Sequence, residues 1–213
     1  TRVSRRDLPS SDPRLTHLIL DPADPASWQR QELRQALAAA DGVVNLAGEP
    51  IAEQRWSETH RRVLLASREA TTAQLVAAMA ALETPPRVLV QGSAVGFYGT
   101  SESASYQEDS PAGSDFLAQI CQRWEQAAAA VPPGSRLVTL RIGIVLGPDG
   151  GALGKMLPVF RLGFGGPVGS GQQWMSWIHR FDLVRLIATA LEDASYSGTY
   201  NAVAPEPVRM GPF

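Results

Sequence analysis

The sequence is poor in cysteine, in net charge and in long apolar runs. Cys121 is the single cysteine among 213 residues, so no intramolecular disulfide can form, which suits a reducing compartment. The 19 Lys and Arg residues nearly balance 21 Asp and Glu residues, and the resulting net charge of −2 lacks the basic excess of a nucleic-acid-binding protein. No apolar run approaches the ~20 residues of a membrane helix, and no signal-peptide pattern opens the chain. We therefore expect a cytoplasmic protein that binds neither nucleic acid nor membrane.

What the sequence does contain is an alternation of short apolar runs and longer helical patterns. The apolar runs lie at residues 15–20, 43–47, 88–90 and 137–142. The helical patterns lie within residues 26–40, from Ser57 to the Pro85-Pro86 pair, from Ser114 to Val131, and within residues 182–193. Such alternation is typical of βαβ units. The sequence therefore predicts an α/β fold in which helices cover both faces of a parallel sheet.

Residues 147–171 stand apart because of their glycine content. Their sequence, GPDGGALGKMLPVFRLGFGGPVGSG, predicts loops around a short helix near residues 153–162. Ordering so many glycines costs conformational entropy, so an ordered segment of this kind usually has a specific geometry to meet. The alternative is a flexible insertion.

The predicted strand ends are where a ligand is expected, because ligands of open parallel sheets bind at the carboxyl ends of the strands. The opening fragment ends in Ser4, Arg5 and Arg6. A guanidinium clamps phosphate, and an arginine after the second strand is how dinucleotide-binding folds accept the 2′-phosphate of NADP. The alternative interpretation is a solvated basic segment.

Three further strand ends carry small or polar residues. The run Asn45-Leu46-Ala47-Gly48-Glu49 offers small residues that let a flat ligand approach the backbone, or else a simple turn. Ser93 leaves the next strand with a hydroxyl that suits a substrate oxygen or the nicotinamide amide, although its surroundings differ from a G-x-S-x-G nucleophile elbow. The last of these strand ends is Arg141-Ile142-Gly143.

Six motifs follow one another along nearly all of the chain: NLAGEPI, RWSETHRRVLLASR, GSAVGFYG, RWE, RIGIVLGPDGGALGKM and GFGGPVGSGQQWMSWIH, with Asp182 after the last. In this order and spacing they resemble the extended and atypical short-chain dehydrogenase/reductases. Within that superfamily the resemblance is to the NAD-dependent epimerase/dehydratase family, in its nucleoside-diphosphate-sugar-epimerase-like branch. The resemblance implies a Rossmann-type, doubly wound parallel sheet that holds NADP(H).

The resemblance also implies roles for individual residues. Ser4 and Arg5 would meet the adenosine 2′-phosphate, and Arg68 would reach the cofactor phosphates or ribose. The remaining expected cofactor residues are Leu46, Ala47 and Gly48 along the cofactor path and Arg141, Ile142 and Gly143 beside the nicotinamide. Ser93 is the candidate catalytic residue, and His179 and Glu49 are the candidate substrate residues. For His179 the alternative is a packing or helix-capping role. No metal ligand set is expected.

The sequence departs from this family in its catalytic pair. Extended members use a Tyr-x-x-x-Lys pair in which the tyrosine accepts a proton. Here Phe116 or Leu117 stands at the tyrosine position and Ile120 or Cys121 at the lysine position. No tyrosine anywhere in the sequence is followed four places later by lysine. The carboxylates of Glu108, Asp109 and Asp115 are alternative bases, and their spacing singles out none of them.

The family's first strand and glycine-rich turn are also absent from the sequence, so we expect it to be part of a longer chain. We expect an NADP-binding domain over residues 1–146 that lacks this strand, and a substrate-side segment over 147–180. The last Rossmann helix and strand, with the start of a C-terminal subdomain, would occupy residues 181–213.

Two functions fit these observations. The first is an NADP(H)-dependent epimerase or oxidoreductase that acts on a small molecule, with nucleotide sugars as one candidate class. The second is a non-catalytic NADP(H)-binding redox sensor or regulator, which the missing Tyr-x-x-x-Lys pair favours. The sequence specifies neither the substrate nor the oligomeric state.

Overall fold

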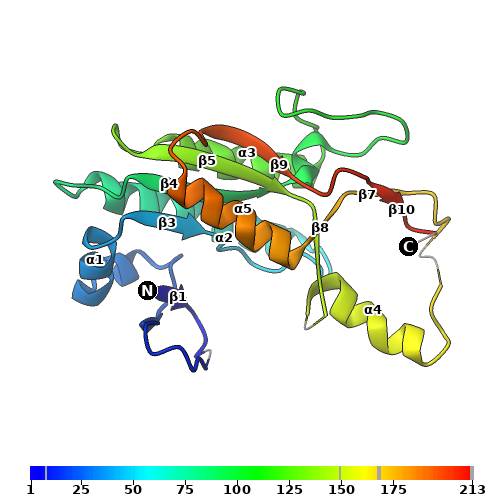
Figure 1. Ribbon diagram of the computed structural model, residues 1–213, viewed down its shortest axis with the longest axis horizontal. Coiled ribbons are helices and arrows are strands. Elements are labelled where there is room, and N and C mark those ends of the chain that lie inside the picture. The colour runs from blue at the N-terminus through cyan, green and yellow to red at the C-terminus, as the bar shows by residue number, and fades with distance from the viewer. Residues whose placement is uncertain (8, 149, 167–168, 212–213) are drawn as a thin grey trace. The chain divides into compact units, whose positions relative to one another are not determined.

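The computed structural model describes residues 1–7, 9–148, 150–166 and 169–211, with the backbone alone for Ala152 and Lys155. These residues form two compact units, and Figure 1 labels their helices and strands. Unit 1 comprises residues 1–91 and 122–137, and unit 2 comprises residues 92–121 and 138–213. Strands alternate with helices along the chain in both units, which confirms the predicted α/β class.

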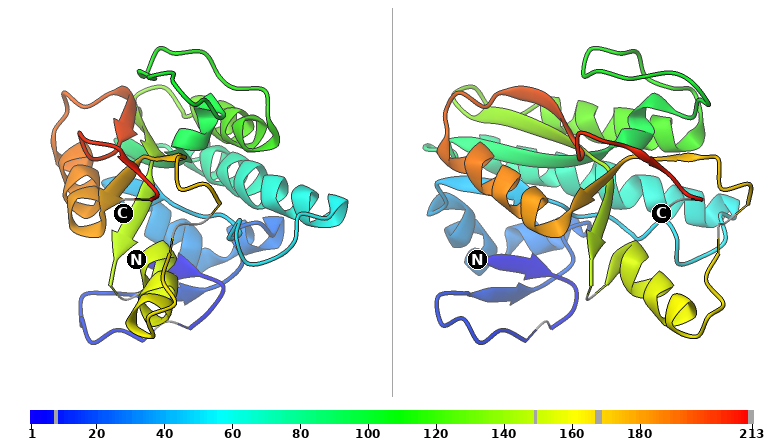
Figure 2. Two further views of the ribbon diagram at one scale, coloured as in Figure 1. Left: turned by 90° about the vertical axis from the view of Figure 1, so that its right-hand side faces the viewer. Right: turned by 45° about the vertical axis from the view of Figure 1, so that its right-hand side comes forward.

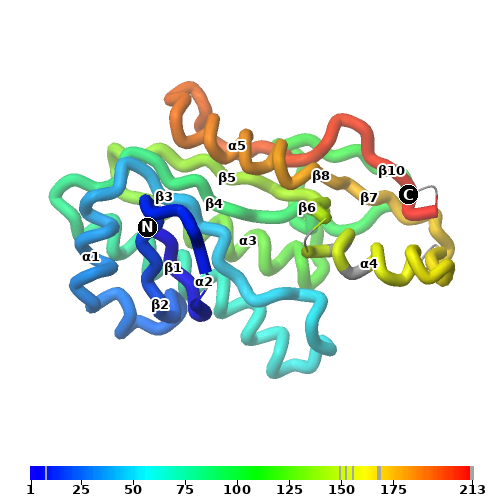
Figure 3. The backbone as a smooth tube through the Cα atoms, turned by 60° about the horizontal axis from the view of Figure 1, so that its bottom comes forward, coloured from blue at the N-terminus to red at the C-terminus, as the bar shows by residue number. Residues whose placement is uncertain are grey.

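Unit 1 begins with a pair of short parallel strands, β1 (Arg2–Ser4) and β2 (His17–Ile19). The two strands run side by side, with Ser4 paired to Ile19 (Figure 3). A 3-10 helix, η1 (Pro25–Gln29), and the helix α1 (Gln31–Ala38) follow. One continuous helix was expected within residues 26–40, but Arg30 is extended and separates the two. The 3-10 helix begins at Pro25, and Asp24 caps it by accepting a hydrogen bond from the Ala26 amide.

The rest of unit 1 is built on β3 (Gly42–Asn45) and the start of β4 (Val88–Ala94), which are parallel. Between them runs α2 (Glu58–Ala80), which Ser57 caps by accepting a hydrogen bond from the His60 amide, as predicted. A hydrophobic core cluster of this unit forms between these helices and the strands and includes Leu37, Leu75, Val76, Met79 and Leu89. Trp28 and Leu82 pack against that core. The second segment of the unit contains the end of α3 (Phe116–Ala129).

Unit 2 contains the strands β5 (Arg136–Ile142) and β9 (Gly198–Ala202), which are parallel from Val138 to Ile142. The four-stranded sheet of the protein has the strand order β3-β4-β5-β9. The short helix η2 (Val95–Tyr98) directly follows β4. The expected run at residues 88–90 is therefore longer than predicted, because the polar residues Gln91 and Ser93 continue the strand.

The remainder of unit 2 surrounds a second parallel pair, β6 (Ile144–Gly147) and β8 (Trp177–His179). The helix α4 (Gly151–Arg161) lies next to β6 (Figure 2). It corresponds to the short helix expected near residues 153–162 of the glycine-rich segment. Unit 2 also contains the helix α5 (Arg180–Glu192) and the antiparallel pair β7 (Trp174–Met175) and β10 (Val208–Arg209). Within the described ranges, no helix combines the length and apolar character needed to cross a membrane.

Candidate functional site

The carboxyl end of β1 holds the predicted phosphate-binding pair. Ser4 is the last residue of the strand, and its hydroxyl donates a hydrogen bond of 2.6 Å to the Arg6 carbonyl oxygen. The Ser4 hydroxyl oxygen also lies 2.8 Å from Nε2 of His17, which is on the neighbouring strand β2. The Ser4 hydroxyl is therefore held from two sides before any ligand is present. The sequence motifs indicate Ser4 but not His17.

Arg5 follows Ser4 and reaches towards the end of β3. Its Nη2 donates to Oε2 of Glu49 at 2.7 Å, and 55% of the Arg5 side chain is exposed against 18% for Glu49. The hydrogen bond from this guanidinium to Glu49 raises the pKa of Arg5 above its ordinary value. The arginine thus keeps its charge, and most of its donor groups face solvent. From the sequence, Arg5 was expected to bind the cofactor and Glu49 the substrate. The structure pairs the two side chains with each other.

The turn after β3 brings Gly48 against Arg68 of α2. A Cβ atom at Gly48 would lie 2.8 Å from Cζ of Arg68, closer than real Cβ contacts, so the guanidinium occupies the space that a side chain would fill. Nη1 of Arg68 donates to the Leu64 carbonyl oxygen at 3.1 Å, and its Cζ lies 5.1 Å from the Trp124 ring centroid. The Leu46 side chain points outwards and is 53% exposed. Along the predicted cofactor path, the exposed apolar residue Leu46 therefore lies two positions before Gly48, and Gly48 contacts the cationic side chain of Arg68.

Asn45, just before this turn, anchors a buried hydrogen-bond network. Its Nδ2 donates to Oγ1 of Thr72 and to Oε1 of Gln91, both at 2.9 Å, and its Oδ1 accepts from the Ala47 amide at 3.2 Å. Nε1 of Trp124 also donates to Thr72 Oγ1, at 3.0 Å. The network ties β3, β4, α2 and α3 together beneath the turn. The Asn45 side chain therefore holds the turn through its bond to the Ala47 amide.

In unit 2, the predicted residues near the end of β5 pack within the protein. Arg141 is only 5% exposed, and its Nη1 donates to Oη of Tyr98 and to the Glu108 carbonyl oxygen, each at 3.0 Å. Its Cζ lies 3.4 Å from the ring centroid of Phe97. Tyr98 in turn donates to Oδ1 of Asn201 on β9 at 2.7 Å. Arg141 therefore fastens η2, the loop that contains Glu108, and β9 to one another.

The same loop is secured at further points. Oε1 of Glu108 accepts from the Asn201 amide at 2.8 Å, and the rings of Tyr98 and Tyr106 stack with centroids 5.0 Å apart. Oδ1 of Asp115 accepts from the Ala118 amide and so caps the start of α3. Two of the three alternative bases thus have structural partners.

Ser93 and Gly143 occupy tightly packed positions. Ser93 lies in β4 and is only 3% exposed. A Cβ atom at Gly143 would lie 2.7 Å from the Ser176 carbonyl oxygen, so this glycine allows the backbone before β8 to pass close to the end of β5. Ile142, the residue between Arg141 and Gly143, is partly buried and pairs with Ala202 of β9. The cofactor roles of these residues, and the catalytic role of Ser93, stay predictions.

His179 caps a helix. It precedes α5, and its Nδ1 accepts a hydrogen bond from the Phe181 amide at 3.3 Å. The imidazole is exposed. This capping role is the alternative weighed for His179, and it leaves the substrate role as a prediction.

The positions of the missing catalytic pair lie on α3. Phe116 and Leu117 are partly buried, and Ile120 and Cys121 are buried. Apolar side chains at these places pack instead of moving protons. Among the residues that the structure describes, no group of three or more His, Cys, Asp and Glu side chains could hold a metal ion.

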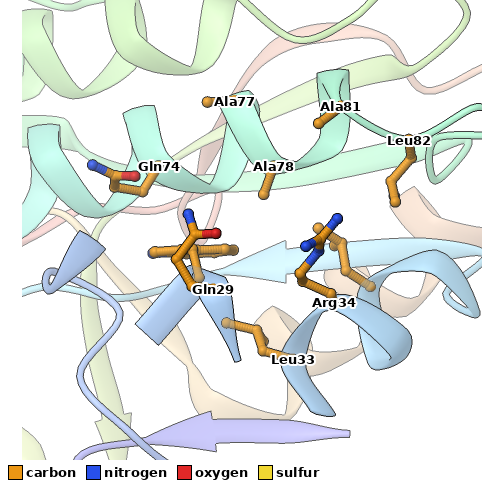
Figure 4. A pocket seen from close by; sticks show the side chains of 10 residues that line it. Gln29, Leu33, Arg34, Gln74, Ala77, Ala78, Ala81 and Leu82 are labelled. Atoms are coloured by element: carbon orange, nitrogen blue, oxygen red, sulfur yellow. The ribbon is translucent and has the colours of Figure 1, made fainter. Parts of the chain in front are cut away.

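One pocket of about 260 Å³ in unit 1 lies away from all the predicted site residues. It opens between the η1–α1 segment and the second half of α2, with Gln29 and Arg34 pointing towards that helix (Figure 4). Trp28, Leu33, Ala78 and Leu82 are among its lining residues. The pocket is a gap in the packing of the two helical segments, and none of the strand ends described above lines it.

Comparisons with known proteins identify the family. The chain matches the NAD-dependent epimerase/dehydratase family over residues 3–202. The chloroplastic homologue of epimerase family protein SDR39U1 from Arabidopsis thaliana is 46% identical over 86% of this chain and 53% of its own length. The chain thus spans about half the length of that relative.

Solved structures agree. The crystal structure of human epimerase family protein SDR39U1 (isoform2) with NADPH is 38% identical, with a TM-score of 0.82 over 98% of this chain and 67% of that one. The crystal structure of a nucleoside-diphosphate sugar epimerase from Corynebacterium glutamicum is 36% identical, with a TM-score of 0.70 over 89% of this chain and 38% of that one. The Rossmann-type fold predicted from the sequence is therefore confirmed, and the chain belongs to the NAD-dependent epimerase/dehydratase family.

Proposed function

We propose that this chain binds NADP(H) and serves an epimerase or oxidoreductase reaction on a small molecule, with nucleotide sugars as one candidate class. The observation that carries the proposal is Arg5, a charged and largely exposed guanidinium at the end of β1, directly after the Ser4 hydroxyl. A charged fork beside a hydroxyl suits a phosphate monoester such as the 2′-phosphate of NADP. The NADPH in the related human structure supports the same cofactor.

The residues of unit 1 fit such a group. The turn at Ala47 and Gly48 carries little side-chain bulk, and Arg68 fills the space beside Gly48 with a second cation. Glu49 holds Arg5 in place and must release part of it when a phosphate binds, because one guanidinium face is used in the ion pair. In this proposal Ser4 and Arg5 bind the 2′-phosphate, Leu46, Ala47 and Gly48 border the cofactor, and Arg68 serves its phosphates or ribose.

In unit 2 we propose that Ile142, Gly143 and Ser93 border the nicotinamide end, and that Ser93 is the residue that touches substrate or nicotinamide. Arg141 supports this end by holding Tyr98 and the Glu108 loop. His179 and Glu49 stay candidates for substrate contact. NADP(H), when bound, supplies hydride chemistry. The proton transfer has no Tyr-x-x-x-Lys pair to serve it, which also supports the second candidate, a non-catalytic NADP(H) sensor.

Calorimetric titration with NADPH and NADH tests the cofactor. We expect NADPH to bind more tightly than NADH. Arg5→Gln should weaken NADPH binding about 10- to 100-fold and change NADH binding little, because only NADPH carries the 2′-phosphate to which Arg5 would donate charge-assisted hydrogen bonds. Arg14→Gln is the matched control, because Arg14 is exposed in the same unit and pairs with Asp12 instead. Equal affinities for both cofactors, or equal losses in Arg5→Gln, would contradict the proposal.

The choice between enzyme and sensor needs a second measurement. Oxidation of NADPH is followed by its absorbance in the presence of nucleotide sugars and small carbonyl compounds. Turnover that Ser93→Ala abolishes without loss of NADPH binding supports the enzyme, whereas binding without any turnover across the panel supports the sensor.

A further inference from the structure

His17 has three polar neighbours, all on or just after β1. Its Nε2 lies 2.8 Å from Ser4 Oγ, and its Nδ1 lies 3.4 Å from Nη2 of Arg2 and 3.5 Å from Oδ1 of Asp7. The imidazole is 13% exposed, whereas the Asp7 side chain is 79% exposed. Arg2 and Asp7 are the charged side chains that these contacts place against the ring. The histidine thus stands between the Ser4 hydroxyl and two opposite charges.

The hydrogen bonds of Ser4 decide which nitrogen of His17 carries a proton. A hydroxyl has one proton to donate, and the Arg6 carbonyl oxygen, which can only accept, takes it at 2.6 Å. The contact between Ser4 Oγ and His17 is therefore donated by Nε2–H. Nδ1 of the neutral ring is then an acceptor, which matches the guanidinium of Arg2, a group that can only donate.

We propose that His17 is a positioning residue for the 2′-phosphate of NADP(H), acting through the Ser4 hydroxyl; the inference rests on the proposed function. The Nε2–H group occupies a lone pair of Ser4 Oγ. The hydroxyl proton must then point elsewhere, and it can exchange the Arg6 carbonyl for a phosphate oxygen without losing the bond from His17. The serine is thereby presented to an anion as a donor.

The second nitrogen adds a response to pH. Histidine is the side chain that ordinarily changes charge between pH 5 and 8. A protonated ring still donates from Nε2 to Ser4, while Nδ1–H turns from the Arg2 guanidinium to the Asp7 carboxylate. The imidazolium adds a positive charge one hydrogen bond away from the proposed phosphate. The 2′-phosphate itself takes up a proton near pH 6 and loses charge. Between pH 8 and 6, the preference for NADPH over NADH is therefore expected to fall less in the unsubstituted protein than in a variant without an ionisable side chain at position 17.

Two substitutions distinguish the Nε2–H donor of His17 from the positive charge of its imidazolium. His17→Leu removes both, and we expect NADPH affinity to fall about fivefold at pH 8, as for the loss of one hydrogen bond, with NADH affinity unchanged. His17→Gln places an amide N–H near the position of Nε2 and never ionises. It should match the NADPH preference of the unsubstituted protein at pH 8 and fall below it at pH 6. Ser4→Ala should abolish the effect of His17→Leu, because the histidine acts through that hydroxyl.

The measurement is calorimetric titration of NADPH and NADH at pH 6, 7 and 8, with Arg14→Gln as the control and thermal unfolding to check each variant. If the unsubstituted protein does not prefer NADPH, the proposed function fails and the inference with it. If it prefers NADPH but His17→Leu weakens both cofactors equally or neither, only the inference is overturned. Should His17→Leu fail to fold, His17→Gln decides: a pH response like that of the unsubstituted protein would overturn the role of the imidazolium.

Discussion

Arg5 and Arg141 both lie at the carboxyl end of a parallel strand, yet their surroundings differ in kind. Arg5 is 55% exposed and has one carboxylate partner, Glu49, on a different strand end. Arg141 is 5% exposed, covers the Phe97 ring and donates to a phenol and a carbonyl oxygen. Position at a strand end therefore does not by itself indicate ligand contact. The arginine with unused donors in solvent is available to an anion, whereas the buried one holds protein groups in place.

The difference extends to the residues around each arginine. Near Arg5, the Ser4 hydroxyl and the Gly48 turn lie at the ends of short strands, where Ser4 is partly buried and Gly48 is exposed. Near Arg141, Tyr98 and Asn201 continue the network, and the stacked ring of Tyr106 adds to it. We infer that the first region binds and the second supports. Substitutions of the two arginines should therefore act on different quantities.

The largest effect is expected for Arg141→Leu. Leucine leaves the Tyr98 hydroxyl and the Glu108 carbonyl oxygen without their donor and removes the cation over Phe97, which should lower the free energy of unfolding by about 3 kcal/mol. For a chain of this size, such a loss lowers Tm by roughly 6–12 °C. Thermal and urea unfolding followed by circular dichroism measure it.

Arg185→Leu is the control for this substitution, because Arg185 is exposed on α5 of the same unit and only faces the Phe181 ring at 5.9 Å. We expect it to change the unfolding free energy by about 0.5 kcal/mol or less. Similar losses in both variants would remove the supporting role given to Arg141.

The comparison also shows what sequence patterns can and cannot predict. The strands β2, β3, β4 and β5, the Ser57 cap and the helix near residues 153–162 follow from local patterns and capping chemistry, so they were predicted. The short strands β7, β8 and β10 were not. The ion pair of Arg5 with Glu49 joins residues 44 positions apart, and the bond of Arg141 to Tyr98 spans 43. No local pattern encodes such pairs, because the fold alone brings the partners together.

His17 was missed for a related reason. It lies within an apolar run, where its partner Ser4 is 13 residues away on the preceding strand. The signal that could have found it is the parallel register, which pairs Arg2 with His17 and Ser4 with Ile19. Ser4 and His17 are therefore two positions apart in the register and on the same face of the strand pair. Asn45, a lone amide at the end of an apolar strand, was noticed from the sequence, but its partners Thr72 and Gln91 were not.

An intermediate effect is expected in the network beneath the first region. Trp124→Phe removes the hydrogen bond from Nε1 to Thr72 but leaves the bond from Asn45 to the same hydroxyl, so we expect a loss of about 1 kcal/mol in unfolding free energy. Thr72→Val removes both bonds and should cost more. In the Thr72→Val background, Trp124→Phe should lose most of its hydrogen-bond contribution. Full additivity of the two losses in urea unfolding would show that the bond contributes nothing.

The smallest effect on stability is expected for Arg5→Gln without ligand. Its ion pair with Glu49 is largely exposed on the arginine side, and surface ion pairs contribute about 0.5 kcal/mol. The residual cost comes from Glu49, which is the less exposed partner and loses its cation. Urea unfolding without cofactor should therefore barely separate Arg5→Gln from Arg14→Gln, although calorimetry with NADPH separates the two clearly. A loss as large as that of Arg141→Leu would mean that Arg5 also holds the fold, and the contrast between a binding and a supporting region would then fail.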